Sequence, residues 1–129
     1  MCKIAYKLKK SPRIGYKLVE KRSGKYYSFY ARTLIQDGEI SPAQKPSDRV
    51  VYNSKMRGKI TAYESRETAL EELAFERLHL LFSRSMYVVA IKVELSGEVF
   101  RLKDVITWCG DPKSIAGTHI RILGEVSDG

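Results

Sequence analysis

Four side chains of the sequence belong to types that bind metals or act as nucleophiles: Cys2, His79, Cys109 and His119. A zinc site needs three or four such ligands, usually supplied as closely spaced pairs such as C-x-x-C. The two cysteines form no such pair, so we expect reduced thiols, no metal and no cofactor. Cys109 and His119 flank one predicted turn and could form a nucleophile and its base. A cysteine packed as a small apolar side chain is the favoured interpretation.

Several motifs of common enzyme families are absent from the sequence. It contains no G-x-x-x-x-G-K-[ST], no G-x-G-x-x-G after a predicted strand, no H-E-x-x-H and no G-x-S-x-G. Those motifs supply the phosphate cradle, the zinc ligands or the exposed serine on which their chemistry depends. The sequence therefore favours a protein that is not an enzyme.

Charge is distributed unevenly along the chain, whose formal net charge is +8. Residues 1–60 contain 15 basic and 4 acidic side chains, whereas residues 61–129 contain 8 and 11. A basic segment that folds onto one face attracts polyanions and speeds association with them. The charge could equally serve solubility alone. If it forms a binding face, the partner is nucleic acid or an acidic protein surface.

Aromatic residues are interleaved with basic ones in the segment 16–32. In a strand, Tyr26, Ser28 and Tyr30 would lie on one face and Tyr27 on the other. Proteins that bind single-stranded nucleic acids combine such aromatic platforms with cations. Alternatively, the tyrosines pack in the core with their hydroxyls at its edge.

Six cations occur in two short polar segments, which we expect to be exposed turns. We predict that they form one partner-binding face, with Tyr27 or Tyr30 as its aromatic anchor. The cations are Lys21, Arg22, Lys25, Lys55, Arg57 and Lys59.

The elements that position these residues are mainly strands in the first half of the chain. Residues 15–21 and 26–32 predict a hairpin around the polar loop 22–25, and residues 3–7 predict a short strand or arm. Residues 36–49 contain Gly38 and two prolines, which indicates a surface loop. Short strands are expected at 50–52 and 60–63.

One helix is predicted at about 65–83, with Ser65 as its N-cap and an apolar stripe that includes Ala74 and ends at Leu81. Its face of Leu70, Leu73 and Leu81 should contact the apolar strand 86–95. Ser96-Gly97 predicts a tight turn into a second hairpin with 98–102, residues 108–112 predict another turn, and 119–126 predict the last strand.

These elements predict an α+β fold: a twisted, mainly antiparallel sheet of five to seven strands with the one principal helix packed on it. The length of 129 residues fits a single domain, 1–129. No apolar run approaches the roughly 20 residues that cross a bilayer, and the N-terminus has no apolar signal-peptide core. We therefore expect a cytoplasmic protein with no membrane partner.

Short segments spread over most of the chain carry a resemblance to known proteins: Cys2–Ile4, Tyr16–Lys21, Gly24–Ser28, Gly58–Ser65, Val93–Val99, Gly117-Thr118 and Ile122–Val126. In these segments the sequence resembles small uncharacterised accessory proteins encoded by bacteriophages and related mobile elements. The resemblance implies a compact protein that interferes with a host system by binding, in the host cytoplasm.

The first functional hypothesis is therefore a non-enzymatic accessory protein whose basic face binds an acidic protein surface or a nucleoprotein complex of the host, for example to inhibit a defence system. The first alternative is a direct binder of single-stranded nucleic acid, which steep weakening by salt would reveal. The second is a small ADP-ribosyltransferase-like enzyme that uses NAD, because the strand-helix-strand succession is similar to part of that fold. The catalytic His or Arg and the glutamate of that family have no match in a suitable context here.

Overall fold

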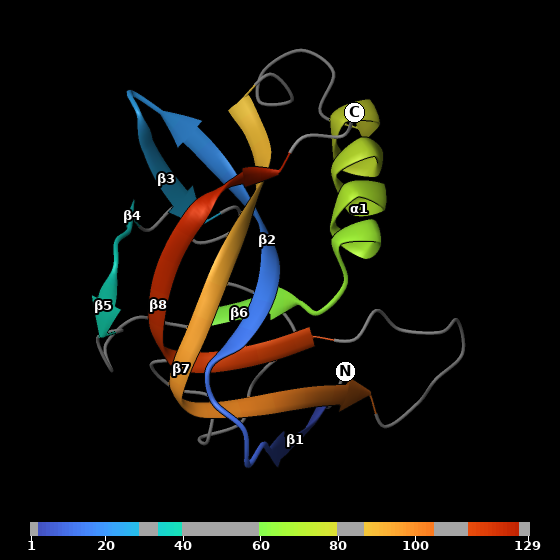
Figure 1. The fold of residues 1–129 in the computed structure, drawn as a ribbon. Helices are drawn as coiled ribbons and strands as arrows, with labels where there is room; N and C mark the ends of the chain where they lie inside the picture. Colours follow the sequence, from blue (N-terminus) through green and yellow to red (C-terminus); the bar gives the residue numbers. More distant parts are fainter. Residues whose placement is uncertain (1–2, 29–33, 40–59, 80–86, 105–113, 127–129) are drawn as a thin grey trace.

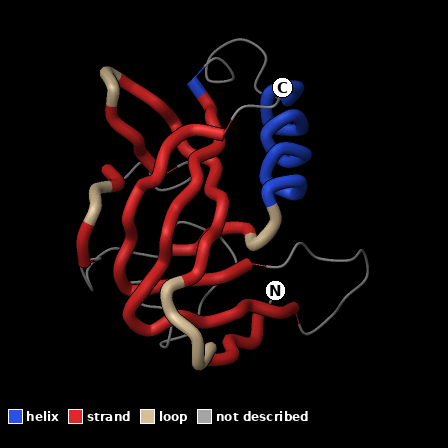
Figure 2. The backbone as a smooth tube through the Cα atoms, viewed as in Figure 1, coloured by secondary structure: helices blue, strands red, loops and turns tan. Residues whose placement is uncertain are grey.

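The computed structural model describes residues 3–28, 34–39, 60–79, 87–104 and 114–126. These residues form one helix and one antiparallel sheet, which lie side by side (Figures 1 and 2). The expected α+β class, with a single helix on a mainly antiparallel sheet, is confirmed. No helix among the described residues has the length and apolar character needed to cross a membrane. The elements are β1 (Lys3–Lys7), β2 (Arg13–Arg22), β3 (Lys25–Ser28), β4 (Leu34–Ile35), β5 (Gly38–Glu39), β6 (Ile60–Tyr63), α1 (Arg66–His79), β7 (Val88–Asp104) and β8 (Ser114–Val126).

The strand order is β1-β7-β8-β6-β2-β3-β4, with β5 paired to β8. Because β7 also pairs with β2, the strands β2, β7, β8 and β6 form a closed ring of neighbours, which the pair Tyr16 and Tyr63 completes. An apolar cluster with side chains from these four strands and β4 fills the ring: Val19, Ile35, Ala62, Ile91, Val93, Leu95, Ile115 and Ile120. The ring thus holds the main core of the protein.

The first hairpin is confirmed, with a two-residue turn. Arg22 pairs with Lys25, and Ser23 and Gly24 between them have φ angles of 51° and 75°. Two consecutive positive φ values are typical of the type I′ turn, whose twist suits two-residue hairpins. Lys25 therefore begins β3 directly after the turn, and Figure 1 shows that β2 and β3 meet at one tip of the molecule.

The helix begins as predicted, because the Ser65 side chain accepts a hydrogen bond from the Thr68 amide at 3.4 Å. Leu73 is 2% exposed and packs in a second apolar cluster with Leu18, Val88 and Ala90 of the sheet; Leu70 borders it. The expected contact between this helix face and the strand is confirmed for Leu73, which shares the cluster with Val88 and Ala90. Leu81 and the predicted last helical residues lie outside the described part of the chain.

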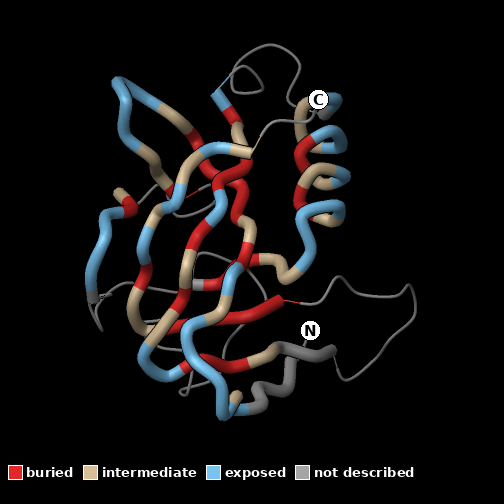
Figure 3. Tube along the Cα trace, viewed as in Figure 1, coloured by how far each residue is buried: buried red, intermediate tan, exposed pale blue. Residues whose placement is uncertain are grey.

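The helix buries a narrower stripe than predicted. Ala74 is exposed, whereas Ala69 and Leu73 are buried (Figure 3). With 3.6 residues per turn, Ala74 lies 100° around the helix axis from Leu73, beyond the edge of the contact with β2 and β7.

The predicted turn at Ser96-Gly97 is wrong. β7 continues through it for 17 residues and pairs with β8 from Ala90 to Leu102, on both sides of the expected turn. The pairing shifts between Ser96 and Val99, so Gly97 and Glu98 face Thr118 alone, which is a β-bulge. Gly97 takes a φ of +76°, and the Thr118 hydroxyl bonds both the Glu98 amide (3.1 Å) and the Ser96 carbonyl (3.4 Å). Glycine and serine here bend a continuous strand instead of ending it.

The last strand starts earlier than predicted, at Ser114, because β6 and β7 pair with its first residues on both sides. Of the expected loop 36–49, residues 36–38 are exposed, and Gly38–Glu39 form the short edge strand β5. The predicted strand at 50–52 and turn at 108–112 lie outside the described residues.

Candidate basic interface

Lys21, the first of the predicted binding cations, is neutralised at the hairpin end. Its Nζ donates to Glu125 Oε2 of β8 at 2.7 Å, and the Tyr26 hydroxyl donates to the same oxygen at 2.9 Å. These two hydrogen bonds lower the pKa of Glu125, and the bond to Glu125 raises the pKa of Lys21. Both groups are charged at neutral pH, so the pair presents little net charge to a partner.

Arg22 is engaged within the same hairpin. Its guanidinium carbon lies 4.2 Å from the centre of the Tyr27 ring, and its Nε lies 3.4 Å from Oε1 of the buried Glu20. Tyr27, a predicted aromatic anchor, is half-buried with one face beneath Arg22. Arginine stacking and partial burial leave less of the ring for a partner.

Tyr26 packs against the core with its hydroxyl at the edge, as the second interpretation of the tyrosines predicts. Its ring packs against the apolar cluster inside the ring of strands, and its hydroxyl is bonded to Glu125. Burial raises the pKa of its hydroxyl, and the bond to Glu125 adds to that shift. Tyr26 therefore serves as a link between β3 and β8.

The structure brings together Lys21, Arg22, Lys25 and Tyr27 of the predicted site, and Lys25 is exposed. Whether these residues share a face with the second predicted turn stays a prediction. Tyr30, Lys55, Arg57 and Lys59 lie outside the described residues.

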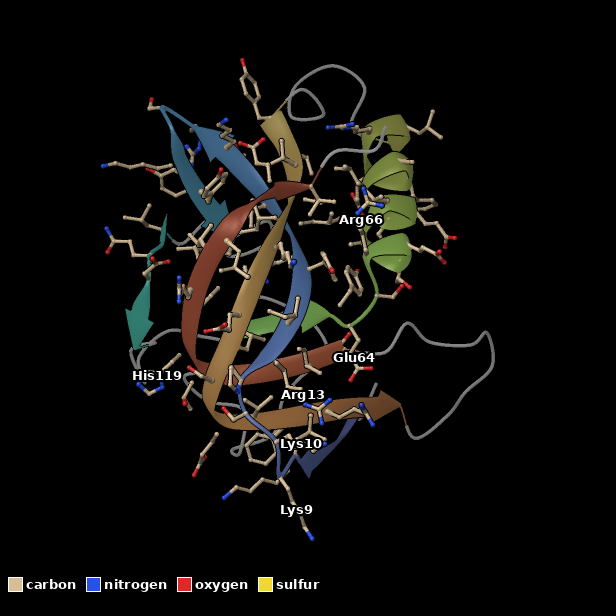
Figure 4. The ribbon with its side chains drawn as sticks, in the orientation of Figure 1. Lys9, Lys10, Arg13, Glu64, Arg66 and His119 are labelled. Carbon is tan, nitrogen blue, oxygen red and sulfur yellow. The ribbon has the colours of Figure 1, made fainter. Side chains whose placement is uncertain are left out.

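A second group of cations, not included in the predicted site, lies between β1 and β2. We call the side chains of Lys7, Lys9, Lys10 and Arg13 the basic connection. The three lysines are exposed and Arg13 is half-buried. Figure 4 shows Lys9, Lys10 and Arg13 at one end of the molecule, and Figure 3 shows the chain exposed there. The signal in the sequence was four cations within seven residues.

Backbone contacts hold the basic connection in place. Lys7 is paired with Phe100 of β7, and the Leu8 amide donates to the Val99 carbonyl at 2.8 Å. Leu8 itself packs against the apolar cluster inside the ring. At the other end, Arg13 Nε donates to the Lys10 carbonyl at 3.3 Å. The segment is therefore a fixed part of the surface.

The basic connection and the hairpin turn lie at opposite ends of β2 (Figure 1). Arg13 and Arg22 are separated by nine residues, or at most about 30 Å along an extended strand. Not every cation between them reaches the surface: Lys17 is 4% exposed and donates to the Thr61 carbonyl at 2.9 Å.

The residues considered for metal binding or nucleophilic chemistry do not form a site in the described part of the chain. No group of three or more His, Cys, Asp or Glu side chains there is arranged to hold a metal. His119 Nδ1 lies 3.1 Å from the Thr118 hydroxyl, which already bonds the β7 bulge. Cys2 and Cys109, and the side chain of His79, lie outside the described residues.

Comparison with known proteins finds no match to a family model, a curated protein or a solved structure.

Proposed function

We propose that the protein is a non-enzymatic binding protein that engages an acidic partner through exposed cations. The observation that carries the proposal is the basic connection. Among the described residues none of its four side chains forms an ion pair, whereas Lys21, Arg22 and Arg101 each contact a carboxylate. Cations without internal counter-charges keep their full attraction for a polyanion.

The biological context remains that of the phage-type resemblance: an accessory protein of the host cytoplasm that engages an acidic host protein or a nucleoprotein complex, such as one of a defence system. Fixed cations on a small domain suit this role, because they speed encounter with an acidic surface and need no cofactor.

The test compares two variants with the same change in net charge. In the first, Lys7, Lys9 and Lys10 are each replaced by Glu; in the second, the exposed residues Lys25, Lys92 and Arg121 are each replaced by Glu. Binding to two polyanions, poly-L-glutamate and a 20-base-pair duplex DNA, is measured at 100 mM salt. We expect the first variant to lose binding to whichever probe the parent protein binds, and the second to retain most of it. Equal losses, or no binding of either probe by the parent, would overturn the proposal.

A further inference from the structure

The partner chemistry of the basic connection can be argued further from what surrounds it, and this inference rests on the proposed function. We infer that the basic connection binds the phosphate backbone of double-stranded nucleic acid, without reading its bases.

The described residues of the basic connection offer a partner no apolar anchor. Stable protein–protein interfaces are centred on buried aromatic, apolar or arginine side chains and are depleted in lysine. Between Lys7 and Arg13 the only large apolar side chain is Leu8, which is packed inward. Ile14 is 41% exposed, but as the next residue of β2 it points to the opposite face of the sheet from Arg13. A lysine-rich surface of this kind suits phosphates better than a protein.

The four side chains of the basic connection are all hydrogen-bond donors that suit phosphate oxygens. Each lysine ammonium is a compact charge with three N–H donors, which can follow phosphate oxygens without fixed geometry. Arg13 donates its Nε hydrogen to the Lys10 carbonyl, which orients the guanidinium and leaves its terminal nitrogens to bind an anion. The segment is bonded to β7 at its start, and its last residue, Arg13, belongs to β2 and pairs with Leu95 of β7. Little ordering of the segment is therefore needed on binding.

The basic connection suits a duplex better than a single strand. Binding of single strands relies on aromatic rings that stack on unpaired bases. The described tyrosines of the hairpin are engaged elsewhere, Tyr26 by Glu125 and Tyr27 by Arg22, and they lie at the far end of β2. Within the described part of the chain, the basic connection therefore offers charge without stacking, which fits the regularly spaced phosphates of a duplex.

Counterion release sets how strongly the affinity for a duplex should depend on salt concentration. Up to four phosphate contacts predict that the logarithm of the affinity falls with the logarithm of salt concentration with a slope of about −3 to −4. Between 50 and 200 mM salt the affinity of the duplex would fall about 100-fold. The affinity should not depend on base sequence, because phosphates carry no sequence information.

The experiment measures fluorescence anisotropy of labelled 20-base-pair duplexes, one DNA and one RNA, each in two unrelated sequences, as salt is raised. The parent protein is compared with the double variant K9Q/K10Q and with the matched control K25Q/K92Q. We expect the slope to drop by about 2 in K9Q/K10Q and to change by less than about 0.5 in the control. Equal affinity for DNA and RNA would assign the site to the backbone charge; a preference would assign it to one helix geometry. Thermal melts confirm that both variants are folded.

Failure of this inference can be distinguished from failure of the proposed function. If poly-L-glutamate binds at the basic connection more tightly than the duplexes do, the partner is an acidic protein: the proposed function stands and the nucleic-acid inference is wrong. If a single strand binds more tightly than the duplex and the affinity depends on its sequence, the inference is also wrong. If neither polymer binds at 50 mM salt, both proposals fail.

Discussion

The two ends of β2 carry similar numbers of cations but use them differently. At the hairpin end, Lys21 is paired with Glu125 and Arg22 lies over Tyr27 beside Glu20. At the other end the lysines of the basic connection extend from a segment whose backbone, not its charge, is bound to β7. Charge counted along a sequence therefore does not show which cations already lie beside a carboxylate in the fold. What distinguishes the two ends is whether a carboxylate lies beside the cation: Glu125 of β8 lies beside Lys21 and Glu20 of β2 beside Arg22, whereas the basic connection has none among the described residues.

Both ends of β2 depend on the packing of α1 on the sheet. Disrupting this packing should have the largest effect, on the free energy of unfolding. Leu73→Ala removes a side chain that is 2% exposed between α1 and the sheet, so we expect it to lower the free energy of unfolding by about 2 to 5 kcal/mol. Chemical denaturation measures the change. At a temperature where the variant is still folded, its salt dependence of duplex binding should match that of the parent; a changed slope would mean that helix packing shapes the basic connection.

Reversing the charges at each end of β2 tests whether the two ends contribute differently to duplex binding. At about 150 mM salt each lost phosphate contact weakens binding roughly five-fold, so we expect K9E/K10E to bind duplex DNA about 30-fold less tightly than the parent. R22E/K25E carries the same change in net charge and should weaken binding by less than about three-fold. Titration of both variants against one duplex gives the ratio. A larger loss of affinity in R22E/K25E than in K9E/K10E would support an interface at the hairpin, whose cations belong to the site predicted from the sequence.

The smallest expected effect concerns the ion pair at the hairpin end. The pKa of Glu125 is lowered by its bonds to Lys21 and Tyr26, so its contribution to stability is present above its ordinary value of 4.5 and is lost as pH falls below it. The pKa of Lys21 is raised, so its contribution disappears only above its ordinary value of 10.5. Both side chains are more than a third exposed, and solvent screening keeps the stabilisation small.

Glu125→Gln checks this assignment. Its melting temperature should lie a few degrees at most below that of the parent at pH 7, and the difference should shrink as pH falls below 4.5, because the carboxylate of the parent then takes up its proton progressively. A difference that keeps the same size as pH falls would show that Glu125 acts through packing. Duplex affinity should stay within about two-fold of the parent, because the released Lys21 lies far from the basic connection.

Local chemistry determined the elements that the sequence predicted well. Ser23-Gly24 can take the positive φ values of a tight hairpin, Ser65 has a hydroxyl for capping, and the leucines of the helix recur at helical spacing. Each of these signals acts within a few residues. The hairpin, the start of the helix and its contact with the central strand were therefore predictable.

Tertiary pairing decided the rest. Ser96-Gly97 has the composition of a turn, but β8 supplies partners on both sides of it and the Thr118 hydroxyl bonds the bulge, so the strand continues. Likewise, Glu125 lies 104 residues from Lys21 in sequence, and nothing local indicates that it neutralises this lysine. By itself the sequence determined how many cations the first half of the chain carries. Only the folded sheet decided which of them meet a carboxylate from another strand, as Lys21 meets Glu125, because that depends on contacts between segments far apart in the sequence.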